Sequence, residues 1–418
     1  MQFIINGGKQ LNGNISISGA KNGAFPLIAG AILTGQRVTL NNIPDIRDVH
    51  NILELVRALG IQTDFENHTL KLYAGQLSSH ELRRDISKRM RASIELTAPV
   101  LARLGIVAFP HPGGCVIGER PIDLFIEGYK KMGATSSVME GMHTLKIKRP
   151  KPISFVFPNI STTATMCLMM LASVADGIST FYNSACEPEI VMLADFLNAS
   201  GAKIKGAGTH TISIEGIDSY PDRDITFTNI PDRVETGSFL FLAAATKSNI
   251  TLTHTNPSHQ TVILDLLDRM GITINFFGDT IEISPPKHFN AISVKTHEYP
   301  GFPTDLQSPL VIALTQATGK SIVHETIFDG RMFWLEDLKR MGAHVMILDT
   351  HRASIEGPSK LKGKELRSPD LRAGMAYIIA GLAAKGTTVI HDIEIIDRGY
   401  EAIEKRLKAM GADIQRVG

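Results

Sequence analysis

A loop rich in proline and glycine carries a cysteine. Cys115 lies within the segment from Phe109 to Pro121, whose composition predicts an exposed loop. Free cysteine is usually found in the core, and the neighbouring Arg120 together with loop N–H groups would favour the thiolate. The segment indicates an available acid or nucleophile, although this loop taken alone fits an inert thiol better.

Basic residues stand where helices are expected to begin. Lys21 immediately precedes an apolar helical stretch from Ala24 to Ile32. A cation is poorly placed at the positive end of a helix dipole, and a bound anion would relieve the conflict. A solvated lysine is the alternative. Five arginines occupy matching places in the chain and together indicate anion clamps: Arg91, Arg120, Arg331, Arg372 and Arg398.

An aspartate follows a rigid turn that contains two prolines. Asp305 comes after the segment from Tyr299 to Pro303 and before an apolar stretch that ends near Leu314. An aspartate in this place predicts a helix N-cap, and the same carboxylate can act as a general base. The two roles are compatible.

Six glycines at a nearly constant interval reveal the elements that must position these groups. Each follows an apolar helical stretch and precedes a short extended segment, which is typical of a left-handed helix cap. They are about 70 residues apart: Gly60, Gly133, Gly201, Gly271, Gly342 and Gly411.

Each repeat is expected to form a small α/β unit of the order strand, helix, strand, helix and a terminal strand pair. One helix in each unit is apolar nearly all round, as in 166–175 and 238–245, and must be buried on every side. Three units can pool these helices in a shared core with their sheets outside, so six units predict two similar lobes. One large mixed α/β domain is the alternative.

The composition is that of an ordinary globular protein. Hydrophobic residues make up 43% of the 418 residues, and a net charge of +1 gives no global field for nucleic acid or an anionic membrane. The start predicts no signal peptide, and the apolar run 373–384 is too short to span a bilayer. Three cysteines and the scattered histidines predict neither disulfides nor a metal site, so a reducing cytoplasm is expected.

Several motifs together resemble the UDP-N-acetylglucosamine enolpyruvyl transferase family, over essentially the whole chain. The segments that carry the resemblance are 18–22 (SGAKN), 90–93 (MRAS), 112–115 (PGGC), 120–124 (RPIDL), 187–190 (EPEI), 231–237 (PDRVETG), 302–305 (FPTD), 370–373 (DLRA) and 396–401 (IDRGYE). The resemblance implies an α/β fold of two lobes. Each lobe is an inside-out α/β barrel of three β-α-β-α-β-β units. It places one lobe at 20–229 and the other at 1–19 plus 230–418.

The same resemblance implies transfer of the enolpyruvyl group of phosphoenolpyruvate to the 3-hydroxyl of UDP-N-acetylglucosamine, an early step of peptidoglycan synthesis. No cofactor or metal is implied, and a monomer or weak homo-oligomer is expected. Lys21, Arg120 and Arg398 would hold phosphoenolpyruvate, while Arg91, Arg331 and Arg372 complete a cationic cleft. Asn22 and Asp305 would position the acceptor hydroxyl, with Asp305 as base. Cys115 would assist either proton delivery to the enolpyruvyl methylene or product release, and it would react with fosfomycin. The UDP contacts would be Arg120, Pro121, Ile122, Asp123, Leu124, Ser161 and Ile327.

The nucleotide side departs from the family pattern at several positions, whereas the phosphoenolpyruvate side is intact. The departures are Glu95, Phe125, Asn159, Thr162, Thr163 and Cys186. Two alternatives therefore stand beside the leading prediction. One is a paralogous enolpyruvyl transferase with another nucleotide or nucleotide sugar as acceptor, and the other is a non-catalytic paralogue that binds a UDP-sugar.

Overall fold

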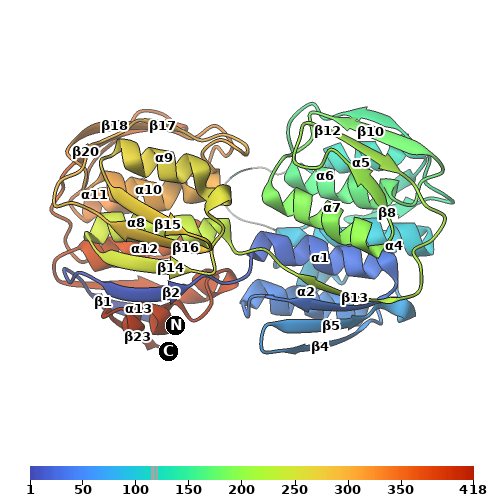
Figure 1. Ribbon diagram of the computed structural model, residues 1–418, viewed down its shortest axis with the longest axis horizontal. Helices are drawn as coiled ribbons and strands as arrows, with labels where there is room; N and C mark the ends of the chain where they lie inside the picture. Colours follow the sequence, from blue (N-terminus) through green and yellow to red (C-terminus); the bar gives the residue numbers. More distant parts are fainter. Residues whose placement is uncertain (114–117, 119–120) are drawn as a thin grey trace. The chain divides into compact units, whose positions relative to one another are not determined.

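The computed structural model describes residues 1–113, 118 and 121–418. Outside the segment 114–120, the chain divides into two compact units (Figure 1). The terminal unit comprises Met1–Ser18 and Pro231–Gly418, and the middle unit comprises residues 19–113 and 121–230.

The middle unit contains three separate sheets. Their strand orders are β13-β3-β5-β4, β6-β8-β7 and β11-β12-β10-β9. The strands are β3 (Arg37–Asn41), β4 (Gln62–Glu66), β5 (Thr69–Tyr73), β6 (Ile106–Pro110), β7 (Thr135–Met139), β8 (Met142–Lys146), β9 (Ser154–Val156), β10 (Ile178–Tyr182), β11 (Lys203–Lys205), β12 (Thr211–Glu215) and β13 (Asp224–Thr228). The helices are α1 (Lys21–Thr34), α2 (Arg47–Ala58), α3 (Arg84–Ser87), α4 (Thr97–Leu104), α5 (Asp123–Lys131), α6 (Thr162–Ala172) and α7 (Pro188–Ser200), with 3-10 turns η1 (Ala74–Gln76) and η2 (Arg91–Leu96).

The terminal unit also contains three sheets, in the orders β15-β16-β14-β2, β17-β18-β20-β19 and β21-β22-β1-β23. The strands are β1 (Gln2–Asn6), β2 (Asn12–Ser16), β14 (Asn249–Thr253), β15 (Thr273–Phe277), β16 (Thr280–Ser284), β17 (Val294–Lys295), β18 (Gly319–His324), β19 (His344–Ile347), β20 (Arg352–Gly357), β21 (Glu365–Arg367), β22 (Thr387–His391) and β23 (Asp413–Val417). The helices are α8 (Arg233–Thr246), α9 (Thr261–Arg269), α10 (Gln307–Leu314), α11 (Leu335–Arg340), α12 (Leu371–Ala383) and α13 (Ile403–Ala409), with 3-10 turns η3 (Pro257–Gln260), η4 (Thr304–Leu306) and η5 (Ile393–Arg398).

All six sheets follow one plan, which confirms the predicted β-α-β-α-β-β repeat and the α/β class. In the five four-stranded sheets the first two strands of the repeat run parallel, and the terminal pair joins them antiparallel. In the sixth, a parallel bridge between Glu81 and Ala108 stands in place of the first strand. Each sheet has its own edge strands, so packing rather than a closed ring of hydrogen bonds encloses the interior.

Three repeats are assembled from distant parts of the chain. Strand β13 provides the first strand of the repeat that contains α1, and β2 provides that of the repeat that contains α8. Strand β1 lies between β22 and β23 and completes the last sheet. In Figure 1, β1 is drawn in blue next to the red β23. The terminal unit is discontinuous in sequence because it uses both ends of the chain.

The predicted glycine caps are confirmed. All six repeat glycines have a positive φ, between 82° and 122°, and stand one or two positions after the last residue of a helix. A side chain in this left-handed region is strained, so glycine is the residue that ends these helices and turns the chain into the next strand.

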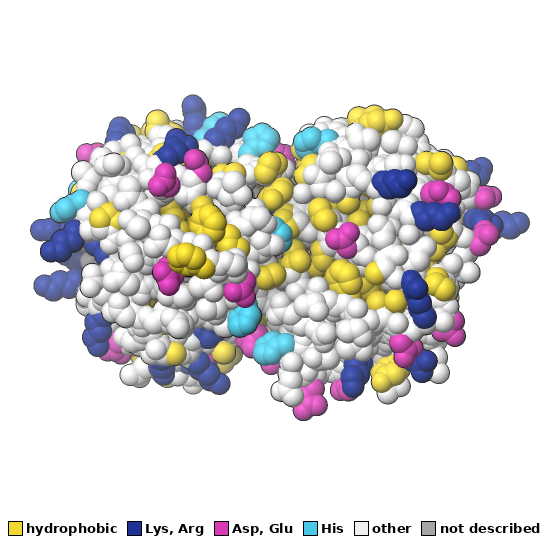
Figure 2. Space-filling model, in the orientation of Figure 1, with side chains coloured by type: hydrophobic (Ala, Val, Ile, Leu, Met, Phe, Trp, Pro, Cys, Tyr) yellow, Lys and Arg dark blue, Asp and Glu magenta, His cyan; other side chains and the backbone are white. Residues whose placement is uncertain are grey.

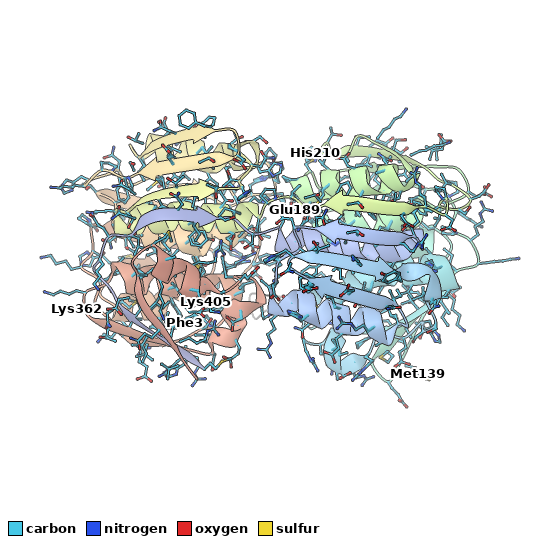
Figure 3. The ribbon with its side chains drawn as sticks, turned by 60° about the horizontal axis from the view of Figure 1, so that its bottom comes forward. Phe3, Met139, Glu189, His210, Lys362 and Lys405 are labelled. Carbon is cyan, nitrogen blue, oxygen red and sulfur yellow. The ribbon has the colours of Figure 1, made fainter. Side chains whose placement is uncertain are left out.

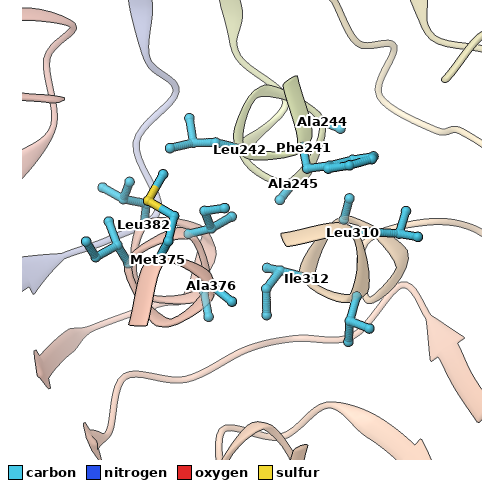
Figure 4. Close-up of a cluster of buried hydrophobic side chains, with 14 of the residues drawn as sticks. Phe241, Leu242, Ala244, Ala245, Leu310, Ile312, Met375, Ala376 and Leu382 are labelled. Atoms are coloured by element: carbon cyan, nitrogen blue, oxygen red, sulfur yellow. The ribbon is translucent and has the colours of Figure 1, made fainter. Parts of the chain in front are cut away.

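The apolar helices form the core of each unit, as predicted. In the terminal unit, α8, α10 and α12 pack against one another (Figure 4). Their contact is built from Phe241, Leu310, Ile312, Met375 and Leu382, among other side chains, all almost fully buried. The strands alternate buried and exposed residues, so each sheet covers the helices with one face; Phe3 of β1, labelled in Figure 3, is fully buried.

Candidate active site

The carboxylate of Asp305 lies between two buried arginines of the terminal unit. Arg331 Nη2 donates to Asp305 Oδ1 at 3.0 Å, and Arg372 Nη2 donates to Oδ2 at 2.8 Å. The arginine side chains are 1% and 7% exposed, whereas that of Asp305 is 26% exposed. Two nearly solvent-free cations therefore fix a carboxylate that still reaches the surface.

The expected N-cap role of Asp305 is replaced by this arrangement. Helix α10 begins after Leu306 without a side-chain cap, and Asp305 lies inside the preceding turn η4. The Pro-rich turn leads into η4 and α10, as predicted. The sequence pattern missed the arginine partners because they come from residues 26 and 67 positions away.

Arg372 begins a chain of hydrogen bonds that runs into the core. Its Nη1 donates to Tyr400 Oη at 3.3 Å, and Tyr400 Oη lies 3.0 Å from Ser238 Oγ, which donates to the carbonyl of Val234. Burial alone would lower the pKa of Arg372, but Asp305, Tyr400 and Asp232 outweigh it and raise that pKa well above the ordinary value. The guanidinium is held in one orientation and stays charged.

Two of the hydrogen-bond donor atoms of Arg331 are not used within the part of the protein that the structure describes. Its Nε and Nη1 are buried and have no hydrogen-bond partner among the described residues. Its guanidinium lies 5.3 Å from the centre of the Phe328 ring. A buried arginine seldom leaves two N–H groups unsatisfied, so these donors indicate a site for an oxygen-rich ligand.

The charged groups near Asp305 lie at or close to the N-termini of three helices, α8, α10 and α12. Asp232 caps α8, and Asp370 caps α12 by accepting from the N–H groups of Arg372 and Ala373. Asp305 lies in the turn η4, which leads into α10. The positive end of a helix dipole favours negative ligands, and the arginines add to this field.

Arg398 ends the turn η5 and is partly buried. The residue before it, Asp397, accepts two hydrogen bonds from Arg416 of β23, at 2.9 and 2.6 Å. Arg416 also donates to Glu404 at 3.1 Å. The last strand of the chain thereby fixes the turn on which Arg398 lies.

In the middle unit, the predicted lysine has a carboxylate partner of its own. Lys21 is the first residue of α1, and its Nζ lies 2.9 Å from Asp48 Oδ2 in the first turn of α2. The side chains are 11% and 3% exposed. The Asp48 carboxylate therefore compensates part of the unfavourable interaction between the Lys21 charge and the positive end of the α1 dipole, a role that we expected a bound anion to fill. Asn22 is partly buried beside Lys21 on α1.

The predicted nucleotide contacts begin just before α5. Arg91 Nη2 donates to the carbonyl oxygen of Pro121 at 3.1 Å. Ile122 is buried, Asp123 is exposed in the first turn of α5, and Leu124 is partly buried. Arg91 thus supports the start of this segment. Cys115 and Arg120, the remaining predictions in this loop, lie outside the described residues.

Ser161, a predicted nucleotide contact, caps α6 by accepting from the N–H of Ala164. The positions that depart from the family pattern lie in different environments. Thr162 donates to Glu187 Oε1 at 2.9 Å. Cys186 Sγ lies 3.4 Å from Nδ1 of His210, which is labelled in Figure 3. In contrast, Phe125 is 2% exposed and is a core residue. Asn159 is exposed, and Thr163 is partly buried on α6.

Glu95 is a buried acid in the turn η2. Its side chain has an oxygen, Oε2, that finds no hydrogen-bond partner in the described part of the chain. Burial raises the pKa of Glu95 to about 8. The carboxyl group is therefore mostly protonated at neutral pH, which avoids placing a charge in the core of the middle unit.

We expect Glu95→Gln to change how stability depends on pH. Because the pKa of Glu95 rises from 4.5 to about 8 on folding, the folded state holds a proton that the unfolded chain releases between these values. The stability of the wild type should fall as pH rises through that window, and level off above it. The variant lacks this loss, so its advantage should grow by about 2–4 kcal/mol between pH 5 and pH 8.5.

Urea unfolding at the two pH values measures this difference. Glu66→Gln, at an exposed position of β4 in the same unit, is the matched control and should show a pH-independent offset. An equal offset for both variants at both pH values would contradict a buried, neutral Glu95.

Three contributors to the site escaped the sequence motifs. Asp48 is an ordinary acid in the first turn of a helix, and Tyr400 was noted only as part of a motif. Glu325, whose contacts are described below, follows His324, but no second histidine stands at the spacing of a zinc site. Their partners are remote in sequence, so only the fold identifies them.

The surface shows no simple charge pattern on the face drawn in Figure 2, where Lys and Arg side chains alternate with Asp and Glu. Among the helices of the described residues, none has both the length and the apolar character required to cross a membrane.

Comparison with known proteins gives consistent results. A family model described as EPSP synthase (3-phosphoshikimate 1-carboxyvinyltransferase) matches residues 5–407. Proteins named UDP-N-acetylglucosamine 1-carboxyvinyltransferase from Desulfosudis oleivorans and Campylobacter hominis are each 41% identical to this chain. The match covers 100% of this chain and 99% and 100% of theirs.

Solved structures agree on the fold. The enolpyruvyl transferase NikO from Streptomyces tendae has a TM-score of 0.90 at 23% identity, covering 100% of this chain and 98% of its own. An EPSP synthase from Acinetobacter baumannii has a TM-score of 0.76 at 19% identity over 100% of both chains. With an end-to-end match to sequence relatives and a shared architecture of two three-sheet units, this chain belongs to the UDP-N-acetylglucosamine 1-carboxyvinyltransferase group of the EPSP synthase family.

Proposed function

We propose that this protein transfers the enolpyruvyl group of phosphoenolpyruvate to the 3-hydroxyl of UDP-N-acetylglucosamine and releases phosphate, the first committed step of peptidoglycan synthesis. The observation that carries the proposal is the full-length match, at 40–41% identity, to relatives whose names state this reaction class and acceptor. The cluster of Asp305, Arg331 and Arg372 supplies chemistry that suits it.

The reaction consists of an addition followed by an elimination. The acceptor oxygen bonds to C2 of phosphoenolpyruvate and loses its proton, while C3 gains a proton and becomes a methyl group. The resulting tetrahedral ketal then loses a proton from C3 and expels phosphate from C2. A general base, a proton donor and several fixed cations are sufficient for these steps.

Asp305 would act as the base of the addition. Its carboxylate is partly exposed and is held by one arginine hydrogen bond to each oxygen, so it is fixed at a place that the acceptor hydroxyl can reach. Arg331 would direct its two unused donors to the phosphate or carboxylate of the substrate. Burial makes both arginine contacts stronger than they would be in water.

The remaining predicted residues would hold the two substrates. Lys21, Arg120 and Arg398 bind phosphoenolpyruvate, Arg91 and Arg372 add positive charge, and Asn22 orients the acceptor. The UDP part contacts Arg120, Pro121, Ile122, Asp123, Leu124, Ser161 and Ile327. The protein would act in the cytoplasm, where both substrates are made, as a monomer or weak homo-oligomer and without a nucleic-acid or membrane partner.

Phosphate release tests the function and the acceptor together. Release should require both phosphoenolpyruvate and UDP-N-acetylglucosamine, and other UDP-sugars and UMP should be poor acceptors. Equal or faster release with one of those would contradict the acceptor, and no release with any of them would contradict the transferase.

Replacing Cys115 by Ala should remove a proton donor. We expect kcat to fall at least about 10²-fold, in the range typical of a general acid, and alkylation by fosfomycin to disappear from the mass spectrum. Cys167→Ala is the matched control, because Cys167 is fully buried in α6; its turnover and labelling should remain. Full activity with unchanged labelling in Cys115→Ala would exclude that thiol from the site.

A further inference from the structure

The side chain of Glu325 is completely buried and is shared by three segments of the terminal unit. Its Oε1 accepts from Thr296 Oγ1 at 3.1 Å, from the N–H of Ile327 at 2.8 Å and from the N–H of Phe328 at 3.2 Å. Its Oε2 accepts from Thr304 Oγ1 at 2.9 Å. A buried carboxylate is costly unless its oxygens are satisfied, and here four donors satisfy it.

Two of these bonds connect Glu325 to the segments that carry Asp305 and Arg331. Thr304 is the neighbour of Asp305 in the turn η4. Phe328 begins the short turn that carries Arg331, whose N–H donates to the carbonyl of Phe328. One carboxylate therefore holds the base on one side and its arginine partner on the other.

The backbone of Glu325 is fixed as well. Its N–H donates to the carbonyl of His351 at 2.7 Å, and its carbonyl lies 2.9 Å from His351 Nδ1. Thr326 also donates twice to Thr296, from its N–H to the Thr296 hydroxyl and from its own hydroxyl to the Thr296 carbonyl. Because its main chain is fixed by these hydrogen bonds, the Glu325 side chain has little freedom to move. It therefore restricts the movement of the two segments to which it is bonded, at Thr304 and at Phe328.

We propose that Glu325 is a positioning residue for the reaction: it sets the distance and angle between Asp305 and Arg331 without touching substrate. The inference rests on the proposed function, because it assigns Glu325 to the alignment of the proposed base. A displacement of about 1 Å in a catalytic group can cost about 10²-fold in rate, so the effect should exceed that of a lost hydrogen bond alone.

The test compares Glu325→Ala with the conservative Glu325→Gln. The Ala variant leaves two buried N–H groups without an acceptor, so we expect kcat to fall about 10–100-fold, with each KM within about threefold of wild type. In the Gln variant the amide oxygen still accepts those N–H bonds, and Thr304 can accept from the amide. Its kcat should therefore remain within about fivefold of wild type.

A double-mutant cycle with Asp305→Asn separates positioning from general stability. If Glu325 acts through Asp305, Glu325→Ala should reduce kcat less than about threefold once the base is gone. The same reduction in both backgrounds would overturn the proposal. If Glu325→Ala does not fold, Thr304→Val replaces it in the cycle, because this variant removes only the bond to Oε2. Its effect on kcat should likewise be less than about threefold in the Asp305→Asn background.

Glu356→Ala, at an exposed position of β20 in the same unit, is the control and should keep wild-type kcat. Thermal unfolding of every variant gives the folded fraction by which kcat is corrected. A corrected kcat of Glu325→Ala equal to wild type would also overturn the proposal. The proposed function is judged separately, from phosphate release and acceptor preference of the wild type.

Discussion

Asp305→Asn is expected to lower kcat by about 10²–10⁴-fold, because the amide cannot take the proton of the acceptor hydroxyl. The shape of the side chain is kept, and one amide oxygen can still accept from an arginine. The loss should therefore appear mainly in kcat, with a smaller change in the KM for UDP-N-acetylglucosamine. Steady-state phosphate release measures both constants.

The same substitution should also weaken the fold of the terminal unit. Arg331 and Arg372 would face a neutral amide, whose Nδ2 donor is opposed to one of the two guanidinium groups. Because Asp305 is partly exposed, we expect a modest cost of about 1–2 kcal/mol in the free energy of unfolding.

Asp265→Asn is the matched control for this prediction. Asp265 lies on α9 of the same unit, is exposed and forms a surface pair with Arg269. Its activity should equal that of the wild type. If Asp305→Asn retained more than about a tenth of wild-type kcat, general-base catalysis by Asp305 would be refuted.

The architecture was accessible from sequence because it repeats. A glycine every 70 residues or so marks a local backbone requirement, a positive φ, that few other residues meet. The all-apolar helices around Phe241 and Met375 indicated burial on every side, and the alternation in segments such as Thr280–Ser284 indicated one wet face. These signals are local and depend little on the rest of the chain.

The exchange of strands between distant segments was not accessible in the same way. Nothing in the residues of β2 or β13 states that these strands pair with β14 and β3, which lie more than 180 positions away. Any strand with one apolar face can pair at several edges, and the choice is made by the tertiary fold. The repeat count is therefore predictable while the assignment of each first strand is not.

In the candidate site, too, some features are predictable from local sequence and others depend on the fold. Turn chemistry and charge indicate Asp305, Arg331 and Arg372 as site residues. The hydrogen bonds that join them are not predictable in this way, since they link segments of two successive repeats that are 26 and 67 positions apart in sequence. Asp48 and Glu325 carried no signal at all, because an acid that meets its partners only after folding resembles any other acid in sequence. Motifs identify the residues that do chemistry better than those that hold them in place.

Arg372→Lys should reduce kcat about 10²–10³-fold, although the charge is retained. The guanidinium of Arg372 spans two acceptors, Asp305 Oδ2 at 2.8 Å and Tyr400 Oη at 3.3 Å. A lysine ammonium is a single point with a different reach, so it cannot hold both with the same geometry. Asp305 would then be aligned by Arg331 alone, and the preorganised field on the substrate would weaken.

Arg372→Met separates charge from packing in the same place. It fills a similar volume but leaves one oxygen of Asp305 and the Tyr400 hydroxyl without their donor, so it should lose at least as much activity as Arg372→Lys and unfold more easily by about 1–3 kcal/mol. The control is Arg367→Met, because Arg367 lies five residues earlier, is 73% exposed and pairs with Asp392 at the surface. If Arg372→Lys and Arg367→Met were equally active, the fork geometry of Arg372 would have no role. If instead Arg372→Lys fails and Arg372→Met fails further, geometry and charge each contribute, as expected of a cation buried beside both the base and the core.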